Sequence, residues 1–247
     1  MITKNLITVI LIFINLTAIS AQSQDTTKIK KQYRLSGLIL PTALITCGAG
    51  ARIIKPIREF DYKIRNYVKL NVTKNYPIDN YMQYAPAIAV FGLDLVGIEA
   101  KNNFRDRALV SATSYLLMTA VVRTMKYTID VQRPNSFDNH SFPSGHTATV
   151  FVGAHILYKE YKDTSPWIAI AGYTVATGTG LLRIYNNHHW LSDTVTGAGI
   201  GILSAEAGYL LLPAFHKMLG VKEKDNRFVI IPSINTNYYG ISLAYSF

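Results

Sequence analysis

The chain has 247 residues, of which 49% are hydrophobic and 16% charged, so it is more apolar than a typical soluble protein. Its net charge of +10 favours an anionic partner, such as a phosphorylated substrate or an anionic membrane surface. The basic residues do not alternate with aromatic residues, so no nucleic acid partner is expected. The single Cys47 excludes an intramolecular disulfide and a cysteine-rich metal site, and its apolar neighbours predict a buried side chain.

Residues 1–21 have the pattern of a signal peptide or a membrane anchor. A lysine near the start is followed by an apolar core and then by small residues. Residues 22–34 are polar, and together with the helices up to residue 74 they form a predicted region of polar linker and N-terminal helices (22–74). Both readings of the first segment direct the chain to the membrane or beyond it.

Apolar periodicity predicts an all-α fold, a helical bundle of about six helices followed by a short C-terminal β-hairpin. The predicted helical segments are 36–54, 52–74, 82–98, 108–125, 146–161, 166–182 and 191–215, with a charged loop at 101–107. Segment 52–74 is amphipathic and basic, which fits either a helix on an anionic surface or an ordinary solvated face. The last helix contains small residues that let helices approach closely: Gly197, Gly199, Gly201, Ala205 and Gly208.

In the tail, residues 221–247, a charged linker is followed by residues with a β-prone pattern in place of the helical pattern. A β-prone run at 228–231 and an alternating pattern at 238–247 predict a hairpin around residues 235–237. An alternating strand that ends in Phe247 also resembles the last strand of an outer-membrane barrel, but one hairpin cannot close a barrel.

Three short segments contain the residues that point to chemistry: 126–134, 141–147 and 183–193. They supply three cations, two spaced histidines and one carboxylate, which suits the binding of a phosphate and the cleavage of a bond to it. Arg133 and Arg183 can fork onto phosphate oxygens. Ser144 and Gly145 at a helix start offer free N–H groups to an anion. His189 and Asp193 are four residues apart and can share a helix face.

Each feature alone has an ordinary structural explanation. Arg133 could cap a loop, Pro-Ser-Gly is a common helix start, and His189 with Asp193 could be a surface pair. The order and spacing of all of them together favour a phosphate site. The residues themselves do not decide which histidine attacks.

The spacing resembles a known signature. Lys126 with six residues before Arg133-Pro134, then Pro143-Ser144-Gly145-His146, then Arg183 with five residues before His189 and three more before Asp193, is similar to the three-part motif of the type 2 phosphatidic acid phosphatase superfamily. That superfamily includes lipid phosphatases, bacterial non-specific acid phosphatases and vanadium haloperoxidases. The resemblance covers roughly residues 75–215 and predicts a domain at 75–220. Leu182 departs from the motif, which usually has serine there.

The resemblance implies a role for each motif residue. His189 would be the nucleophile that forms a phosphohistidine, Asp193 would orient and activate it, and His146 would donate a proton to the leaving oxygen. The phosphate-binding groups would be Lys126, Arg133, Ser144, Gly145 and Arg183. No metal and no cofactor is implied. His140 and His155 are interpreted as structural residues, and His188 as a neighbour of the nucleophile.

The expected function is a metal-independent phosphatase that hydrolyses a phosphate monoester or diphosphate of a membrane lipid. The alternatives are a periplasmic acid phosphatase acting on soluble esters, a vanadium haloperoxidase, and a non-catalytic envelope protein that binds lipid. The expected location is the bacterial cell envelope, with the protein associated with the membrane and the site facing the periplasm. The sequence names neither the substrate nor an oligomeric state.

Overall fold

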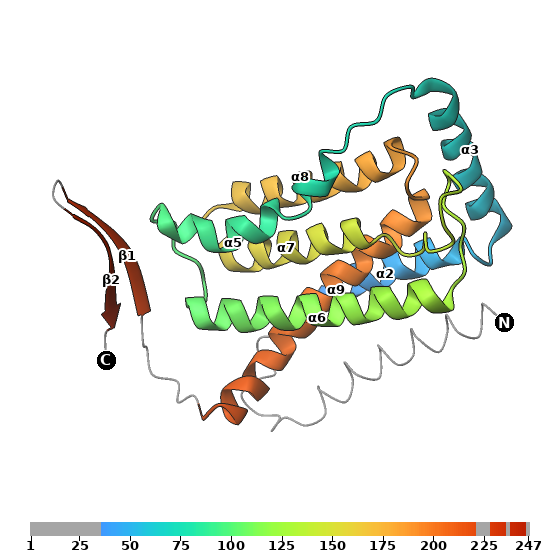
Figure 1. Ribbon diagram of the computed structural model, residues 1–247. Coiled ribbons are helices and arrows are strands. Elements are labelled where there is room, and N and C mark those ends of the chain that lie inside the picture. Colours follow the sequence, from blue (N-terminus) through green and yellow to red (C-terminus); the bar gives the residue numbers. More distant parts are fainter. Residues whose placement is uncertain (1–35, 221–227, 236–237, 246–247) are drawn as a thin grey trace.

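The computed structural model describes residues 36–220, 228–235 and 238–245, so the predicted signal segment lies outside the described residues. The described part contains eight helices followed by one two-stranded sheet (Figure 1). The helices are α2 (Ser36–Gly50), α3 (Lys55–Asn71), α4 (Asp79–Met82), α5 (Ala85–Leu95), α6 (Phe104–Thr128), α7 (Gly145–Tyr161), α8 (Pro166–Tyr185) and α9 (Leu191–Met218). The fold of the main body is all-α, as predicted. Six of these helices form the bundle, and α3 and α4 are additional.

The C-terminal hairpin is also confirmed. Strand β1 (Phe228–Asn235) pairs antiparallel with β2 (Tyr238–Tyr245), in a register that places Phe228 opposite Tyr245 and Asn235 opposite Tyr238. The hairpin therefore turns where the alternating pattern predicted it.

Helix boundaries follow local capping residues, and two predicted boundaries were wrong. The predicted charged loop at 101–107 becomes helical from Phe104, because the Asn103 side chain accepts a hydrogen bond from the N–H of Asp106 (2.9 Å) and starts α6. The predicted helix at 82–98 forms only over residues 85–95, as α5, and the short α4 precedes it. Pro86 lies in the first turn of α5, where its missing N–H costs no helical hydrogen bond.

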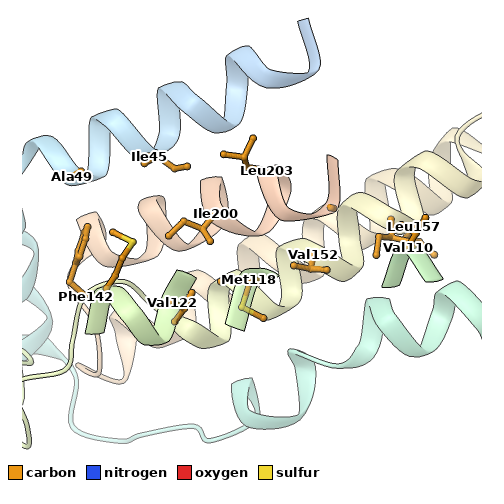
Figure 2. Close-up of a cluster of buried hydrophobic side chains, with 14 of the residues drawn as sticks. Ile45, Ala49, Val110, Met118, Val122, Phe142, Val152, Leu157, Ile200 and Leu203 are labelled. Atoms are coloured by element: carbon orange, nitrogen blue, oxygen red, sulfur yellow. The ribbon is translucent and has the colours of Figure 1, made fainter. Parts of the chain in front are cut away.

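The core lies where α7 and α9 pass between the other helices (Figure 2). Ile45 and Ala49 of α2 face Ile200 and Leu203 of α9, and Val152 of α7 packs in the same cluster. All five residues are less than a tenth exposed. The core is therefore continuous from α2 to α7 through α9.

Glycines on α9 allow the close helix approach that the sequence predicted. A Cβ at Gly197 would lie 2.5 Å from the carbonyl oxygen of Ser144, and one at Gly201 would lie 2.5 Å from that of Ala148. These distances are shorter than van der Waals contact, so side chains there would push α9 away from α7. Gly197 thereby sets the distance between the first turn of α7 and the first turns of α9.

The prediction that Cys47 is buried was wrong, since its side chain is exposed. The buried face of α2 contains Pro41, Ile45, Gly48 and Ala49. At 100° per residue, Cys47 points away from that face. Apolar neighbours in sequence do not determine the helix face of a residue.

Two helices, α6 and α9, are long and apolar enough to cross a membrane by length and composition. Helices α2 and α3 pass the same test only as a pair, and they are bent by 82° at the break between them. In Figure 1, α3 stands at one end of the bundle beside the loop between α6 and α7. Arg65 of α3 donates a hydrogen bond to the carbonyl oxygen of Pro134 in that loop (3.0 Å).

The basic helix α3 forms as predicted, but only Asp61 and Val68 on it are buried. Phe60, Tyr67 and Leu70 are exposed beside its lysines and arginines. The helix thus carries both aromatic and cationic side chains on its surface, a combination found in helices that lie at membrane interfaces.

Candidate active site

The predicted site residues converge at one end of the bundle, although they come from different elements. Lys126 ends α6, Arg133 lies in the following loop, Ser144 to His146 begin α7, Arg183 lies near the end of α8, and His189 and Asp193 flank the start of α9. Helix ends therefore bring all eight residues to one region.

His189 and Asp193 form a buried pair. His189 Nδ1 lies 3.3 Å from Asp193 Oδ2, and both side chains are nearly inaccessible to solvent. The same carboxylate oxygen accepts hydrogen bonds from Ser141 Oγ (2.5 Å) and from the Trp190 N–H (3.0 Å). Burial lowers the pKa of His189 to about 4, so the imidazole is neutral at neutral pH. With Nδ1–H donated to Asp193, Nε2 keeps its lone pair.

That free nitrogen faces a cation. Arg133 Nη1 lies 3.4 Å from His189 Nε2, and Arg133 Nε donates to Asp138 Oδ1 (2.8 Å). Asp138 therefore fixes the guanidinium while leaving its other edge toward the histidine. Lys126 Nζ donates to the carbonyl oxygens of His140 (2.5 Å) and Ser141 (3.3 Å), which ties the end of α6 to the loop before α7.

Arg183 is buried and held by residues that the sequence reasoning did not select. Its Nη1 donates to Asp79 Oδ2 at 2.6 Å, and Asn186 Nδ2 donates to Asp79 Oδ1 at 3.2 Å. Arg183 Nε is buried and has no hydrogen-bond partner within the described part of the chain. A buried donor without a hydrogen-bond partner is uncommon in folded proteins.

His146 lies at the start of α7, with Nε2 3.0 Å from Asn80 Oδ1. The same amide oxygen is 3.4 Å from Arg183 Nη1, so Asn80 links this histidine to the cation. Burial, followed by the positive charge of Arg183, lowers the pKa of His146 to about 4. His146 is therefore neutral at pH 7.

Ser144 caps α7. Its buried hydroxyl is 2.9 Å from Thr147 Oγ1, and its N–H donates to the carbonyl oxygen of Asp193 (3.0 Å). The residue thus joins the first turns of α7 and α9. The first N–H groups of a helix have no partner inside it, so the backbone of Gly145 and His146 can contribute donors to an anion.

The remaining histidines take up different surroundings. His188 Nδ1 is 3.4 Å from Asn135 Nδ2, beside the site but away from Asp193. His155 is buried against Glu206 (2.8 Å) and Tyr173 (2.6 Å) inside the bundle, which fits its interpretation as structural. His140 is exposed and stacks edge-on with Tyr127.

Ser141, Asp79, Asn80 and Asn186 are the site neighbours that the sequence analysis did not assign. Pro77, Asp79 and Asn80 are residue types typical of a turn and a helix start, and α4 begins at Asp79, but nothing in the sequence connects Asp79 to an arginine 104 positions later. Within the described residues, no group of three or more His, Cys, Asp or Glu side chains is arranged to hold a metal ion.

An apolar groove of about 320 Å³ lies near the end of α8, on the helix face opposite to Arg183. It is lined by Val68 of α3 and by Leu181, Leu182, Ile184 and Tyr185 of α8. A second groove of about 690 Å³ lies further along α8 and shares Leu181 with the first. Apolar surface therefore extends along α8 from the cationic end of the bundle.

Residues 107–217, which contain all three motifs, match the model of the PAP2 superfamily. This part of the chain is therefore similar to the PAP2 superfamily. The Lipid A 1-phosphatase of Porphyromonas gingivalis is 43% identical to it over 133 residues, covering 53% of this chain and 30% of that protein. The bacitracin transport permease protein BcrC of Bacillus licheniformis is 32% identical over 100 residues, covering 39% of this chain and 47% of that protein. The chain thus matches less than half the length of these two relatives.

Two solved structures share similarity with the chain. The Aquifex aeolicus LpxE structure has a TM-score of 0.44 and 22% identity, covering 61% of this chain and 93% of that one. The transmembrane PAP2 type phosphatidylglycerolphosphate phosphatase of Bacillus subtilis has a TM-score of 0.41 and 17% identity, covering 89% of this chain and 98% of that one.

Proposed function

We propose that this protein is a phosphatase that hydrolyses a phosphate monoester or diphosphate of a membrane lipid through a phosphohistidine. The observation that carries the proposal is the orientation of His189, whose Nδ1 lies on Asp193 and whose Nε2 faces Arg133. A neutral imidazole with a fixed tautomer and an unprotonated Nε2 beside a cation is an activated nucleophile for the phosphorus atom of an anionic phosphoryl group.

The reaction takes two displacements. His189 Nε2 forms a bond to phosphorus while the bond from phosphorus to the leaving oxygen breaks, and His146 supplies the proton that this oxygen takes up. Water then attacks the phosphohistidine, His146 takes the water proton, and inorganic phosphate leaves. Arg133, Arg183 and Lys126, with the N–H groups that begin α7, stabilise the charge on the phosphoryl oxygens in both steps.

For His146 to donate a proton to the leaving oxygen, substrate binding must raise its low pKa. A bound phosphoryl group brings negative charge next to the cations that depress this pKa, so the pKa of His146 rises and the imidazole takes up a proton. The general acid is thereby loaded only when substrate is present.

This proton uptake can be measured with sulfate, a tetrahedral dianion that carries no proton at pH 6. We expect the protein to take up as much as about one proton for each sulfate bound at pH 6. Calorimetry of sulfate binding in two buffers of different ionisation enthalpy measures this number. The uptake should vanish in His146→Asn and persist in His188→Asn. Binding without proton uptake in the unchanged protein would contradict the role of His146.

Support for a lipid substrate comes from the apolar grooves that run along the exposed surface of α8, a surface of which a soluble ester would make no use. The name of the Porphyromonas gingivalis relative makes a lipid A phosphate the first substrate to test. The orientation of the site toward the periplasm stays a prediction from the sequence.

The test is phosphate release in the presence of EDTA. The panel should contain lipid A 1-phosphate, phosphatidylglycerol phosphate, undecaprenyl diphosphate, phosphatidate and a soluble aryl phosphate. We expect kcat/KM for at least one lipid to exceed that for the aryl phosphate by about tenfold or more, since apolar binding contributes only where a chain is present. Release from the aryl phosphate alone would assign the protein to soluble-ester phosphatases. Release that requires an added metal would contradict the proposed chemistry.

A further inference from the structure

Arg52, in the turn between α2 and α3, reaches the catalytic pair from a part of the chain outside the three motifs. Its side chain is 15% exposed. Arg52 Nη2 donates to Ser192 Oγ (2.5 Å) and to Asp61 Oδ2 (3.3 Å), and lies 3.8 Å from Asp193 Oδ1. The guanidinium carbon also lies 5.3 Å from the centre of the Phe142 ring.

The two oxygens of Asp193 have different surroundings. Oδ2 has three close partners, which are His189 Nδ1, Ser141 Oγ and the Trp190 N–H. Oδ1 is buried and has no hydrogen bond within the described part of the chain. Oδ1 forms an ion pair with Arg52. A buried carboxylate oxygen without a hydrogen bond is costly unless a cation compensates its charge.

Asp61 holds this cation and the start of α9 together. Its Oδ1 accepts a hydrogen bond from the Ser192 N–H (3.0 Å), and its Oδ2 accepts one from Ser192 Oγ (2.5 Å) and one from Arg52. Ser192 precedes Asp193 in the first turn of α9. A carboxylate from α3 therefore caps the helix whose first turn carries the catalytic carboxylate.

Close packing of α2 on α9 brings Arg52 to this place. A Cβ at Gly48 would lie 2.3 Å from Thr196 Oγ1 and 2.6 Å from the carbonyl oxygen of Ser192. Only glycine allows this approach, and α2 ends two residues later at Gly50. The turn that follows then delivers Arg52 to the first turn of α9.

We propose that Arg52, fixed by Asp61, is a positioning residue that compensates the charge on Oδ1 of Asp193 and so keeps Oδ2 directed at His189. The inference rests on the proposed function of that pair. Arg52 does not face the phosphoryl group, and its effect reaches the nucleophile only through Asp193.

The charges around the pair determine the direction of the pH effect. The charged groups that face it are Arg52 from the α2–α3 turn, Asp61 from α3, Lys126 from α6 and Arg133 from the loop before α7. Loss of the Arg52 cation makes it easier to add a proton to the Asp193–His189 pair. Because His189 attacks as the neutral imidazole, the acidic limb of kcat/KM then moves to higher pH.

The experiment compares Arg52→Gln, Arg52→Met and Arg52→Lys with the control Arg58→Met, which removes an exposed arginine of α3. We expect kcat to fall about 10- to 100-fold in the first two variants with KM changed less than about threefold, as for other residues that orient a catalytic group. The apparent pKa of the acidic limb of kcat/KM should rise by about one unit in these two variants. In Arg52→Lys, the apparent pKa of the acidic limb should return to the value of the unchanged protein. The control Arg58→Met should match the unchanged protein in kcat, KM and pH profile.

A second readout needs no activity. Exchange of the imidazole C2 hydrogen, followed by mass spectrometry over a range of pH, gives the pKa of His189 directly. A raised pKa of His189 in Arg52→Gln supports the inference, even if the unchanged protein releases no phosphate and the proposed function fails. An unchanged pKa of His189 in the folded variant overturns it, as does a loss of kcat with no movement of the acidic limb. If neither charge-removing variant folds, an unshifted His189 pKa in Arg52→Lys supports the inference and a shifted one overturns it.

Discussion

Replacing His189 with alanine is expected to lower kcat by at least about 10⁴-fold, because the proposed nucleophile is lost and the surrounding cations alone would provide only residual catalysis. The matched control is His188→Ala. This neighbour lies beside Asn135 rather than Asp193, so its loss should leave kcat within about tenfold of the original value.

The geometry also predicts which nitrogen is phosphorylated. Nδ1 is engaged with Asp193, so the phosphoryl group should be found on Nε2 of His189. Rapid alkaline quenching during turnover, followed by mass spectrometry of the peptide, would locate it. Phosphate release that persists in His189→Ala, or a phosphoryl group on Nδ1, would contradict the mechanism. A phosphopeptide containing His146 instead would exchange the roles of the two histidines.

Replacing Arg183 with methionine is expected to damage both stability and activity. The change leaves the buried Asp79 carboxylate without its ion-pair partner, which costs about 3–5 kcal/mol in comparable buried pairs. It also removes a donor to the phosphoryl group, so kcat/KM should fall about 10²- to 10³-fold. Unfolding in detergent by denaturant, together with steady-state kinetics, would measure the two effects. Arg123→Met, an exposed arginine of α6, serves as the control.

The double variant Arg183→Met/Asp79→Asn separates these effects. Removing the unpaired carboxylate should recover about 1–2 kcal/mol of the free energy of unfolding relative to Arg183→Met, while activity stays low. Equal free energies of unfolding for the single and double variants would show that the charge of Asp79 is compensated by other groups in Arg183→Met. Recovery of activity in the double variant would show that Arg183 does not bind the phosphoryl group.

Local spacing in the sequence was sufficient to predict part of this site. The four-residue interval between His189 and Asp193 predicted a shared face, and the two side chains lie 3.3 Å apart. Pro143-Ser144-Gly145 predicted the start of a helix, and α7 begins at Gly145 with Ser144 as its cap. These features depend on backbone geometry within one or two turns, which the sequence encodes directly.

The groups that hold the site in place could not be predicted in this way. Arg183 pairs with Asp79 across 104 positions, and Arg52 reaches Ser192 across 140. Such contacts depend on how closely helices pack, which is decided by details such as the missing side chain of Gly48. An isolated arginine in a turn carries no sign of its distant partner. For the same reason, Cys47 was assigned to the wrong face of α2.

The packing of α2 against α9 has a consequence for biosynthesis. These are the first and the last helices of the described part of the bundle. Arg52 and Asp61, which lie early in the chain, form hydrogen bonds with Ser192 in the first turn of α9. During synthesis, the N-terminal helices must wait until α9 has been made, on the order of 10 seconds at typical elongation rates. A nascent chain that stops before α9 lacks Asp193 and leaves Asp61 without Ser192. We therefore expect phosphatase activity to appear only after α9 has been synthesised and packed against α2.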